Sequence, residues 1–277
     1  MGLRITTNVA SINAQRVMSG NTREMQKSMA QLSTGSRITK AGDDAAGLAI
    51  SENLKSNIRS YGQASRNAND GISMISTAEQ SMGEISNILT RVRELGIQAS
   101  SDTVGEQERG FIQKEVNALK AEVQRVAEST SFGSRKLLDG TGGVYDIHVG
   151  TSSNESTDWI SYDSSQTNVT ADALGIAGLD FTSKDGARNG LAALDTAQMS
   201  VNGSRANLGA MQNRLSSAVD VIGTMSESLS AANSRIRDAD IAQSTAELAR
   251  NSVLLQGTTS VLSQANQQPQ MALKLLG

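Results

Sequence analysis

Few residues in this chain stand in patterns that could perform catalysis. Asp43 and Asp44 are adjacent carboxylates, which could share acid–base work or bind a hard cation. Adjacent residues point in different directions on a helix, and two carboxylates are too few ligands for such a cation. The pair therefore favours a loop or a helix cap, where aspartate is a preferred residue.

Two other features also invite a chemical interpretation. The run Gly140-Thr141-Gly142-Gly143 resembles a phosphate loop, but no buried strand precedes it and no Lys-Ser or Lys-Thr pair follows it. His148 is the only histidine, and no nucleophile signature surrounds it. We interpret the glycine run as a hairpin turn and His148 as a structural side chain. The sequence thus predicts no catalytic residue, no metal site and no cofactor.

The composition excludes further classes of protein. The 277 residues include no Cys and one His, so thiolate and His-pair metal sites are excluded. The net charge of -3 comes from 25 basic and 28 acidic residues spread along the chain, without the basic block that nucleic acid requires. No run approaches the ~18 apolar residues of a membrane span, and no cleaved signal peptide is recognisable.

The elements that position these residues are mainly helical. Heptad spacing marks one long helix before the middle of the chain and another after it, and a shorter helix is predicted at 103–128. Each long helix would extend roughly 65 to 80 Å. We therefore predict a mainly α fold in which long antiparallel coiled-coil helices form a rod. The residues of the predicted seam are Leu54, Tyr61, Ile75, Met82, Leu89, Leu194, Val201, Leu208, Leu215 and Ile222.

The heptad phase breaks near both ends of the chain. One break falls in Ser234–Asp240, and the other lies between Thr34 and Asp44, where turn residues interrupt the helix. Two joints at matched distances from the termini suggest that the terminal segments pair as an inner helical domain. The apolar residues expected to make its assembly contacts are Ile5, Val9, Ile12, Met18, Met25, Leu32, Ile241, Leu248, Leu255 and Leu262.

The middle of the chain has a different composition. It is rich in Gly, Ser, Thr and Asp, and the alternating runs Val144–Val149 and Trp159–Tyr162 predict a small β-hairpin region. The predicted organisation is an inner domain from 1–45 and 235–277, a second domain from the helices of 46–139 and 187–234, and a small β-rich surface segment at 140–186.

Several runs of the sequence match one family in order. On these runs the chain resembles bacterial flagellin over roughly residues 1–139 and 187–277, in a compact form with a short middle. The matching runs are Arg4–Asn8, Leu32–Ile38, Gly42–Ile50, Gln63–Ser73, Arg91–Leu95, Leu208–Leu215, Ser234–Asp240 and Gln264–Pro269.

The resemblance implies a structural subunit that polymerises into the helical flagellar filament for swimming motility, outside the cell. In flagellins the paired terminal helices line the filament channel, the inner helices form the next shell, and the middle faces outward. A terminal helix with one apolar face cannot bury that face alone, so we expect folding to be coupled to assembly through contacts that do not close. A chain without Cys and with few aromatic residues also suits unfolded export through a narrow channel.

The resemblance also implies partners. They are other copies of the chain, the flagellar cap and hook-associated junction proteins, an export chaperone, and the vertebrate Toll-like flagellin receptor. By position, the receptor patch corresponds to Arg91, Leu95 and Glu115. The segment read by cytosolic sensors and the chaperone corresponds to Leu273, Leu275 and Leu276, followed here by Gly277 rather than a basic residue. The Ser/Thr-rich stretch 151–170 resembles a region that carries O-linked sugars in some flagellins.

Two rival interpretations remain at this point. A hook–filament junction adaptor would share the terminal helices, but the Gln63–Ser73 run and the Gly42–Gly47 joint favour flagellin, and growth of long filaments would separate the two. A peptidase carried on a flagellin scaffold would need a His-Glu-x-x-His signature. The single histidine excludes it.

Overall fold

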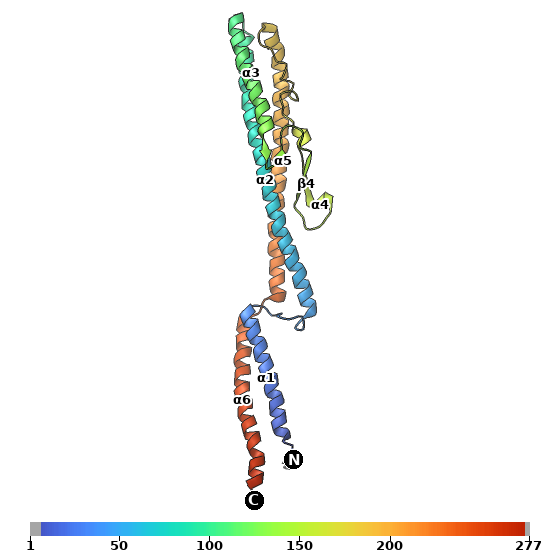
Figure 1. The fold of residues 1–277 in the computed structure, drawn as a ribbon, viewed down its shortest axis with the longest axis vertical. Helices are drawn as coiled ribbons and strands as arrows, with labels where there is room; N and C mark the ends of the chain where they lie inside the picture. Colours follow the sequence, from blue (N-terminus) through green and yellow to red (C-terminus); the bar gives the residue numbers. More distant parts are fainter. Residues whose placement is uncertain (1–6, 275–277) are drawn as a thin grey trace. The chain divides into compact units, whose positions relative to one another are not determined.

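The computed structural model describes residues 7–274, with side chains as far as Gln267. The helices of this part are α1 (Val9–Thr34), α2 (Ala45–Ala99), α3 (Glu106–Ser129), α4 (Glu155–Asp158), α5 (Lys184–Arg237) and α6 (Ile241–Lys274), and the strands are β1 (Ser131–Phe132), β2 (Arg135–Lys136), β3 (Val144–His148) and β4 (Trp159–Asp163) (Figure 1). The prediction of a mainly α fold with long helices and a small β element in the middle is confirmed.

The chain divides into two compact units. We call the unit formed by the described residues up to Ser56 and from Ser228 onward the terminal unit, and the unit Asn57–Glu227 the inner unit. Helices α2 and α5 contribute to both. The terminal unit thus includes the first residues of α2, as far as Ser56, and the last residues of α5, from Ser228, although both lie on the inner side of the predicted joints.

The terminal unit is an antiparallel pair of α1 and α6. Near the start of α1, Asn8 Nδ2 donates to Ala265 O at 2.7 Å, while at the other end Ala239 N donates to Gly35 O at 2.9 Å. Asn8 also caps α1, because its side chain accepts a hydrogen bond from Ser11 N. Gly35 ends α1 in the left-handed conformation, with φ of 66°, which favours glycine.

The inner unit places α2 and α5 side by side in opposite directions. Arg93 Nε lies 2.8 Å from Asp195 Oδ1, and Arg205 Nη2 lies 2.7 Å from Glu79 Oε1. As residue numbers rise along α2 they fall along α5, which establishes the antiparallel arrangement. Helix α3 turns back along α2, since the Arg109 guanidinium donates to Ala99 O at 2.9 Å.

The core of the inner unit follows the heptad pattern. The large side chains of the seam are at most 4% exposed from Ile75 onward, whereas Leu54 and Tyr61 are half-buried. Helix α3 adds Ile112, Val116 and Val123 to the same core. Each buried leucine or isoleucine contributes roughly 1.5–3 kcal/mol by leaving water, so this seam holds the three helices together.

The β element consists of two short antiparallel pairs. Strands β3 and β4 pair with Tyr145 opposite Tyr162, and the two rings stack at 6.1 Å between centroids. The buried face of the hairpin lies close to α2, because a Cβ at Gly71 would come within 2.6 Å of Ile147 Cδ1.

The predicted hairpin turn at Gly140–Gly143 is wrong in one respect. Strand β2 pairs with β1 and β3 pairs with β4, so the run connects two hairpins rather than turning within one. Gly140 and Gly143 both have left-handed φ, which explains glycine at these two positions. Within the described residues, no helix is both long enough and apolar enough to cross a bilayer.

Candidate assembly surfaces

The terminal unit leaves large apolar side chains in contact with solvent. Val9, Ile241 and Val253 are 65%, 52% and 67% exposed. A surface of this kind on a water-soluble protein marks an interaction site. We call the following side chains the terminal apolar surface: Val9, Ile12, Val17, Met29, Ile241, Val253, Leu254 and Val261.

Small residues account for this exposure. The side chains buried between α1 and α6 are Ser11, Ala14, Ser28, Ser244 and Ala265. Small side chains let two helices approach closely, and the larger side chains beside them are then only half-buried or are exposed. The helix pair therefore does not enclose its own apolar residues.

The predicted assembly residues divide into three groups. Val9, Ile12 and Ile241 are exposed, and Ile5 lies outside the described residues. The remaining six are half-buried beside the small residues: Met18, Met25, Leu32, Leu248, Leu255 and Leu262.

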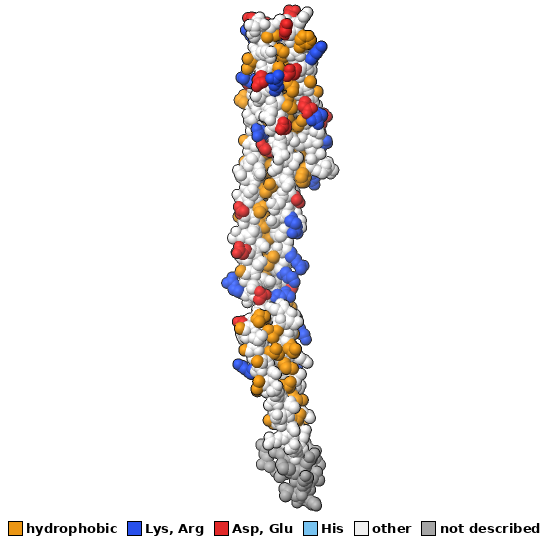
Figure 2. Space-filling model, turned by 90° about the vertical axis from the view of Figure 1, so that its left-hand side faces the viewer, with side chains coloured by type: hydrophobic (Ala, Val, Ile, Leu, Met, Phe, Trp, Pro, Cys, Tyr) orange, Lys and Arg blue, Asp and Glu red, His pale blue; other side chains and the backbone are white. Residues whose placement is uncertain are grey.

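The terminal apolar surface also carries little charge. Helix α6 has no Asp, Glu, Lys or Arg between Asn251 and Gln267. On the face drawn in Figure 2, hydrophobic side chains gather over the terminal helices with few charged ones among them, whereas charges of both signs cover the inner unit. A neighbour on this surface would meet little desolvation cost from ionised groups.

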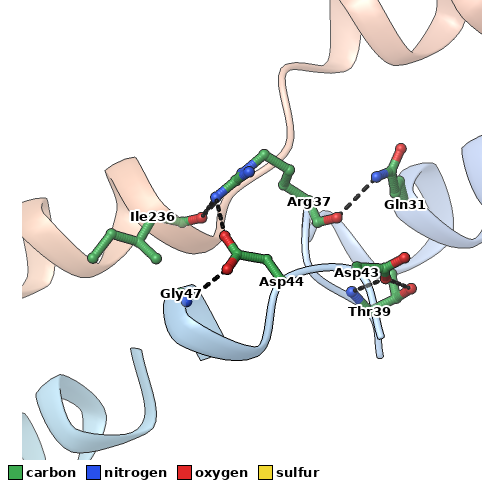
Figure 3. A network of polar contacts seen from close by, with 7 residues as sticks. All are labelled: Gln31, Arg37, Thr39, Asp43, Asp44, Gly47 and Ile236. Atoms are coloured by element: carbon green, nitrogen blue, oxygen red, sulfur yellow. Dashed lines mark hydrogen bonds and ion pairs between the residues drawn. The ribbon is translucent and has the colours of Figure 1, made fainter. Parts of the chain in front are cut away.

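The joint between α1 and α2 is held to the joint between α5 and α6 (Figure 3). Arg37 N donates to Arg237 O at 2.6 Å, and the Arg37 guanidinium donates to Ile236 O at 2.9 Å. A cation at the carboxyl end of α5 satisfies carbonyl groups that the helix leaves free. The sequence did not reveal this contact, because nothing local indicates that residues 199 positions apart meet.

The two adjacent aspartates of this joint have separate roles. Asp44 caps α2, because its Oδ1 accepts from Gly47 N at 2.8 Å, and its other oxygen faces Arg37 at 3.5 Å. Asp43 Oδ2 accepts from Thr39 Oγ1 at 2.9 Å and from the backbone N of Thr39 and Lys40. The expected loop and cap roles of this pair are therefore confirmed.

These bonds favour the ionised form of Asp43. The Thr39 hydroxyl, followed by the Lys40 and Thr39 backbone donors, lowers the pKa of Asp43 from 3.8 to about 2. Lys27 adds a favourable charge at 3.5 Å. The carboxylate thus orders the tight turn that leads into α2.

The structure brings together two of the three residues of the proposed receptor patch on the surface. Arg91 Nη2 lies 2.9 Å from Glu115 Oε1, and both side chains are about half exposed, at 51% and 47%. Hydrogen bonds to Glu115 and then Glu94 raise the pKa of Arg91 above its ordinary value. Leu95 is only 2% exposed and belongs to the core, so it supports this surface from beneath.

The C-terminal leucines and the histidine add no site. Leu275 and Leu276 lie outside the described residues, and the side chain of Leu273 is not described. His148 Nε2 lies 2.9 Å from Ser152 O, and the ring meets Trp159 edge-on, which is a structural environment. In the described part of the chain, no three His, Asp or Glu side chains converge as metal ligands.

A helix pair with an exposed apolar surface, joined to an inner helical unit with its own core, is the arrangement of a helical assembly subunit. The bacterial flagellin N-terminal helical region matches residues 5–142, and the C-terminal helical region matches residues 191–276. A flagellin of Halalkalibacterium halodurans is 42% identical over 272 residues, covering 98% of this chain and 99% of the relative. The chain belongs to the bacterial flagellin family. It is a structural subunit of the flagellar filament and not an enzyme.

Solved structures agree with this fold. The crystal structure of Bacillus cereus flagellin matches with a TM-score of 0.51 and 29% identity, covering 56% of this chain and 88% of that one. A Vibrio parahaemolyticus protein described as flagellar hook-associated matches with a TM-score of 0.58 over 71% of this chain and all of its own, at 16% identity. At that identity the likeness shows the fold alone, and nothing in these comparisons favours the adaptor.

Proposed function

We propose that the terminal apolar surface is the part of the chain through which it polymerises into the filament. The observation that supports this is the contrast between the two units. Most large apolar residues of the inner seam are buried, whereas the eight residues of the terminal apolar surface on α1 and α6 remain exposed beside a small-residue interface. Contacts between copies would remove the second set from water.

Folding of the terminal unit is coupled to this assembly. The fully buried side chains between α1 and α6 are small and the larger ones there are only half-buried, so this pair gains less transfer free energy than the inner seam. Burying the exposed valines and leucines against neighbouring copies adds the missing stabilisation. The inner unit, with its own core, is the folded part of the free subunit.

The partners beyond the chain itself are part of the same proposal. An unfolded route of export agrees with the absence of Cys and the low aromatic content of 3%. The segment that includes Leu273, Leu275 and Leu276 would bind the export chaperone before assembly. The cap and the hook-associated junction proteins would meet the same terminal helices at the two ends of the filament, which lies outside the cell.

Polymerisation of the purified chain tests the proposal. Monomer is seeded with short filament fragments and followed by negative-stain microscopy and circular dichroism. We expect long filaments and a rise in helicity as the terminal unit folds. Short stubs, or a chain that stays monomeric with seeds, would instead support a junction adaptor or a minor subunit that needs a partner.

Recognition by the Toll-like flagellin receptor is a second candidate function, supported by the exposed Arg91–Glu115 ion pair. Because Leu95 is buried, the informative variant is the surface double change Arg91→Ala with Glu115→Ala, with Arg125→Ala and Glu122→Ala as a matched exposed pair on α3. We expect the first double variant to weaken the reporter response to monomer and the second to leave it intact. Equal responses would refute this role.

A further inference from the structure

Three methionines lie on one face of α1. Met18, Met25 and Met29 are spaced by seven and four residues, so their side chains follow one another along the helix. We call these three side chains the methionine face. Met18 and Met25 are half-buried, and Met29 is a member of the terminal apolar surface with 54% exposure. The other members of that surface are valine, isoleucine or leucine, so the thioether is the reactive group there.

A thioether sulfur accepts an oxygen atom from a mild oxidant. With hypochlorous acid, an S–O bond forms and the O–Cl bond breaks, while chloride and a proton leave. The sulfur supplies the electron pair for the new bond, so it is oxidised and the chlorine is reduced, and methionine becomes methionine sulfoxide. Because the chain has no cysteine, no thiol competes for the oxidant. The exposed methionines are therefore the side chains that react first.

The core of the inner unit is protected from the same reagent. Its methionines Met74 and Met82 are buried. Met199 and Met225 of α5 are exposed but do not belong to the core cluster. We therefore expect limited oxidation of the free subunit to leave the fold of the inner unit intact.

A sulfoxide on the methionine face would oppose assembly. Its oxygen is a hydrogen-bond acceptor, and water must be removed from it when α6 or a neighbouring copy covers the face. Between Ile241 and Gln267, α6 has a single basic residue, Arg250, which is exposed, so this helix offers few cationic donors. An acceptor that is buried without a donor costs free energy, and an oxidised copy should add to the filament less readily.

We propose that the methionine face is an oxidation site that controls assembly, at which hypochlorous acid or a related oxygen-atom donor blocks addition of the free subunit. This inference rests on the proposed function, in which the terminal unit folds as neighbouring copies cover it. The control then acts in one direction only. The three sulfur atoms are open to oxidant in the free subunit and are covered in the filament, so oxidant stops growth without dissolving what has formed. Reduction of the sulfoxide restores addition.

Oxidation of purified monomer before polymerisation tests the inference. The test variant removes the sulfur from the methionine face at nearly constant volume, through Met18→Leu, Met25→Leu and Met29→Leu. The matched control makes three such changes on α5, through Met199→Leu, Met211→Leu and Met225→Leu. All chains receive the same limited dose of hypochlorite, are quenched with free methionine and are added to wild-type seeds.

We expect the dose to raise the critical concentration of the wild type and of the α5 control roughly tenfold over their untreated values. The test variant should change by less than about twofold, since leucine does not react. Damage to the inner unit would affect the test variant equally, so resistance of that variant excludes such damage as the cause.

Two further measurements follow the sulfur itself. Treatment of the oxidised wild type with methionine sulfoxide reductases for both epimers should restore its growth on seeds. Peptide mass spectrometry should show severalfold slower oxygen uptake on the methionine face in finished filaments than in free subunits.

The outcomes separate this inference from the proposed function. If untreated wild-type chains form filaments but the oxidised test variant loses growth as the wild type does, the oxidation site is overturned while assembly stands. Equal oxygen uptake by the methionine face in filaments and in free subunits also overturns it. If untreated wild-type chains form no filaments on seeds, both proposals fail. Selective resistance of the test variant together with recovery on reduction supports the site.

Discussion

At the scale of single residues, the joint of the terminal unit depends on a few side chains with distinct partners. Asp43 holds the turn at Thr39 and Lys40, Asp44 caps α2, and Arg37 reaches the last turn of α5. Each bond replaces one that the backbone of a linker would otherwise make with water. The geometry of the joint therefore responds to the charge state and shape of these side chains.

Asp43 makes the joint sensitive to strong acid. Its pKa is lowered from 3.8 to about 2, so the ionised carboxylate stabilises the folded joint above about pH 4, and this contribution is lost as the pH falls toward 2. In filaments with Asp43→Asn we expect a lower thermal dissociation temperature at pH 6 and a smaller further loss between pH 4 and 2. Asp220→Asn, an exposed aspartate of α5, serves as the control. Parallel pH profiles for Asp43→Asn and wild type would contradict this role.

Arg37 should not be replaceable by lysine. Its Nε and Nη2 both donate to Ile236 O, a geometry that a single ammonium cannot reproduce. We expect Arg37→Lys to weaken the joint by about 1 kcal/mol and to accelerate tryptic cleavage of the linker in filaments, since the cleavage site itself is retained. Arg23→Lys on the exposed face of α1 controls for the substitution. An unchanged cleavage rate would argue against this role of Arg37.

At the scale of elements, the two helix pairs use apolar residues in opposite ways. In α2 and α5 the large side chains of the seam are buried, whereas in α1 and α6 the buried side chains are small and the large ones are half-buried or exposed. Changes in the two pairs should therefore separate subunit stability from assembly.

Leu208 and Val253 provide that separation. Leu208 is 1% exposed in the inner seam, so Leu208→Ala should destabilise the free subunit by roughly 2–5 kcal/mol, measured by urea unfolding. Val253 is 67% exposed, so Val253→Ala should leave that transition within about 0.5 kcal/mol and yet raise the critical concentration for polymerisation. If Val253→Ala polymerises like the wild type, this part of the terminal apolar surface is not an interface.

Much of this arrangement could be predicted from the sequence, because heptad spacing repeats along both long helices. The seam from Ile75 to Ile222 is buried as its periodicity indicates. For Leu95, the heptad spacing and the resemblance to flagellins point to different environments. Leu95 follows Val92 by three positions on the apolar stripe, so the spacing indicates that it is buried, as the structure shows. The resemblance instead implied that it belongs to a surface patch.

Other features could not be predicted from spacing. Ser11 and Ser28 are buried, but a polar small residue gives no periodic hydrophobic signal. The pairing of Arg37 with Ile236 depends on which distant segments meet. The pairing of β3 with β4 also depends on a strand register that short alternating runs do not determine.

At the scale of the whole molecule, we expect the inner unit to fold independently and the terminal unit to drive assembly. A fragment comprising residues 46–236 retains the seam of α2, α3 and α5 but lacks α1 and α6. We expect this fragment to unfold in one cooperative transition and to remain monomeric when seeds are added. Calorimetry would measure the first property and sedimentation the second. Filaments formed by the fragment alone would show that the terminal apolar surface is dispensable.

The crossing at residues 35–37 and 236–239 has a mechanical consequence. Arg37 N bonds to Arg237 O, Ala239 N bonds to Gly35 O, and Ser36 pairs with Asp238, so the two linkers form a short antiparallel clasp. When a rotating filament twists its subunits, tension in one linker is shared with the other through these bonds. Because hydrogen bonds between antiparallel segments run perpendicular to the chain, a pull along the two linkers would load these bonds together. We therefore expect the resistance of the joint to torque to depend on how many of these bonds connect the two linkers.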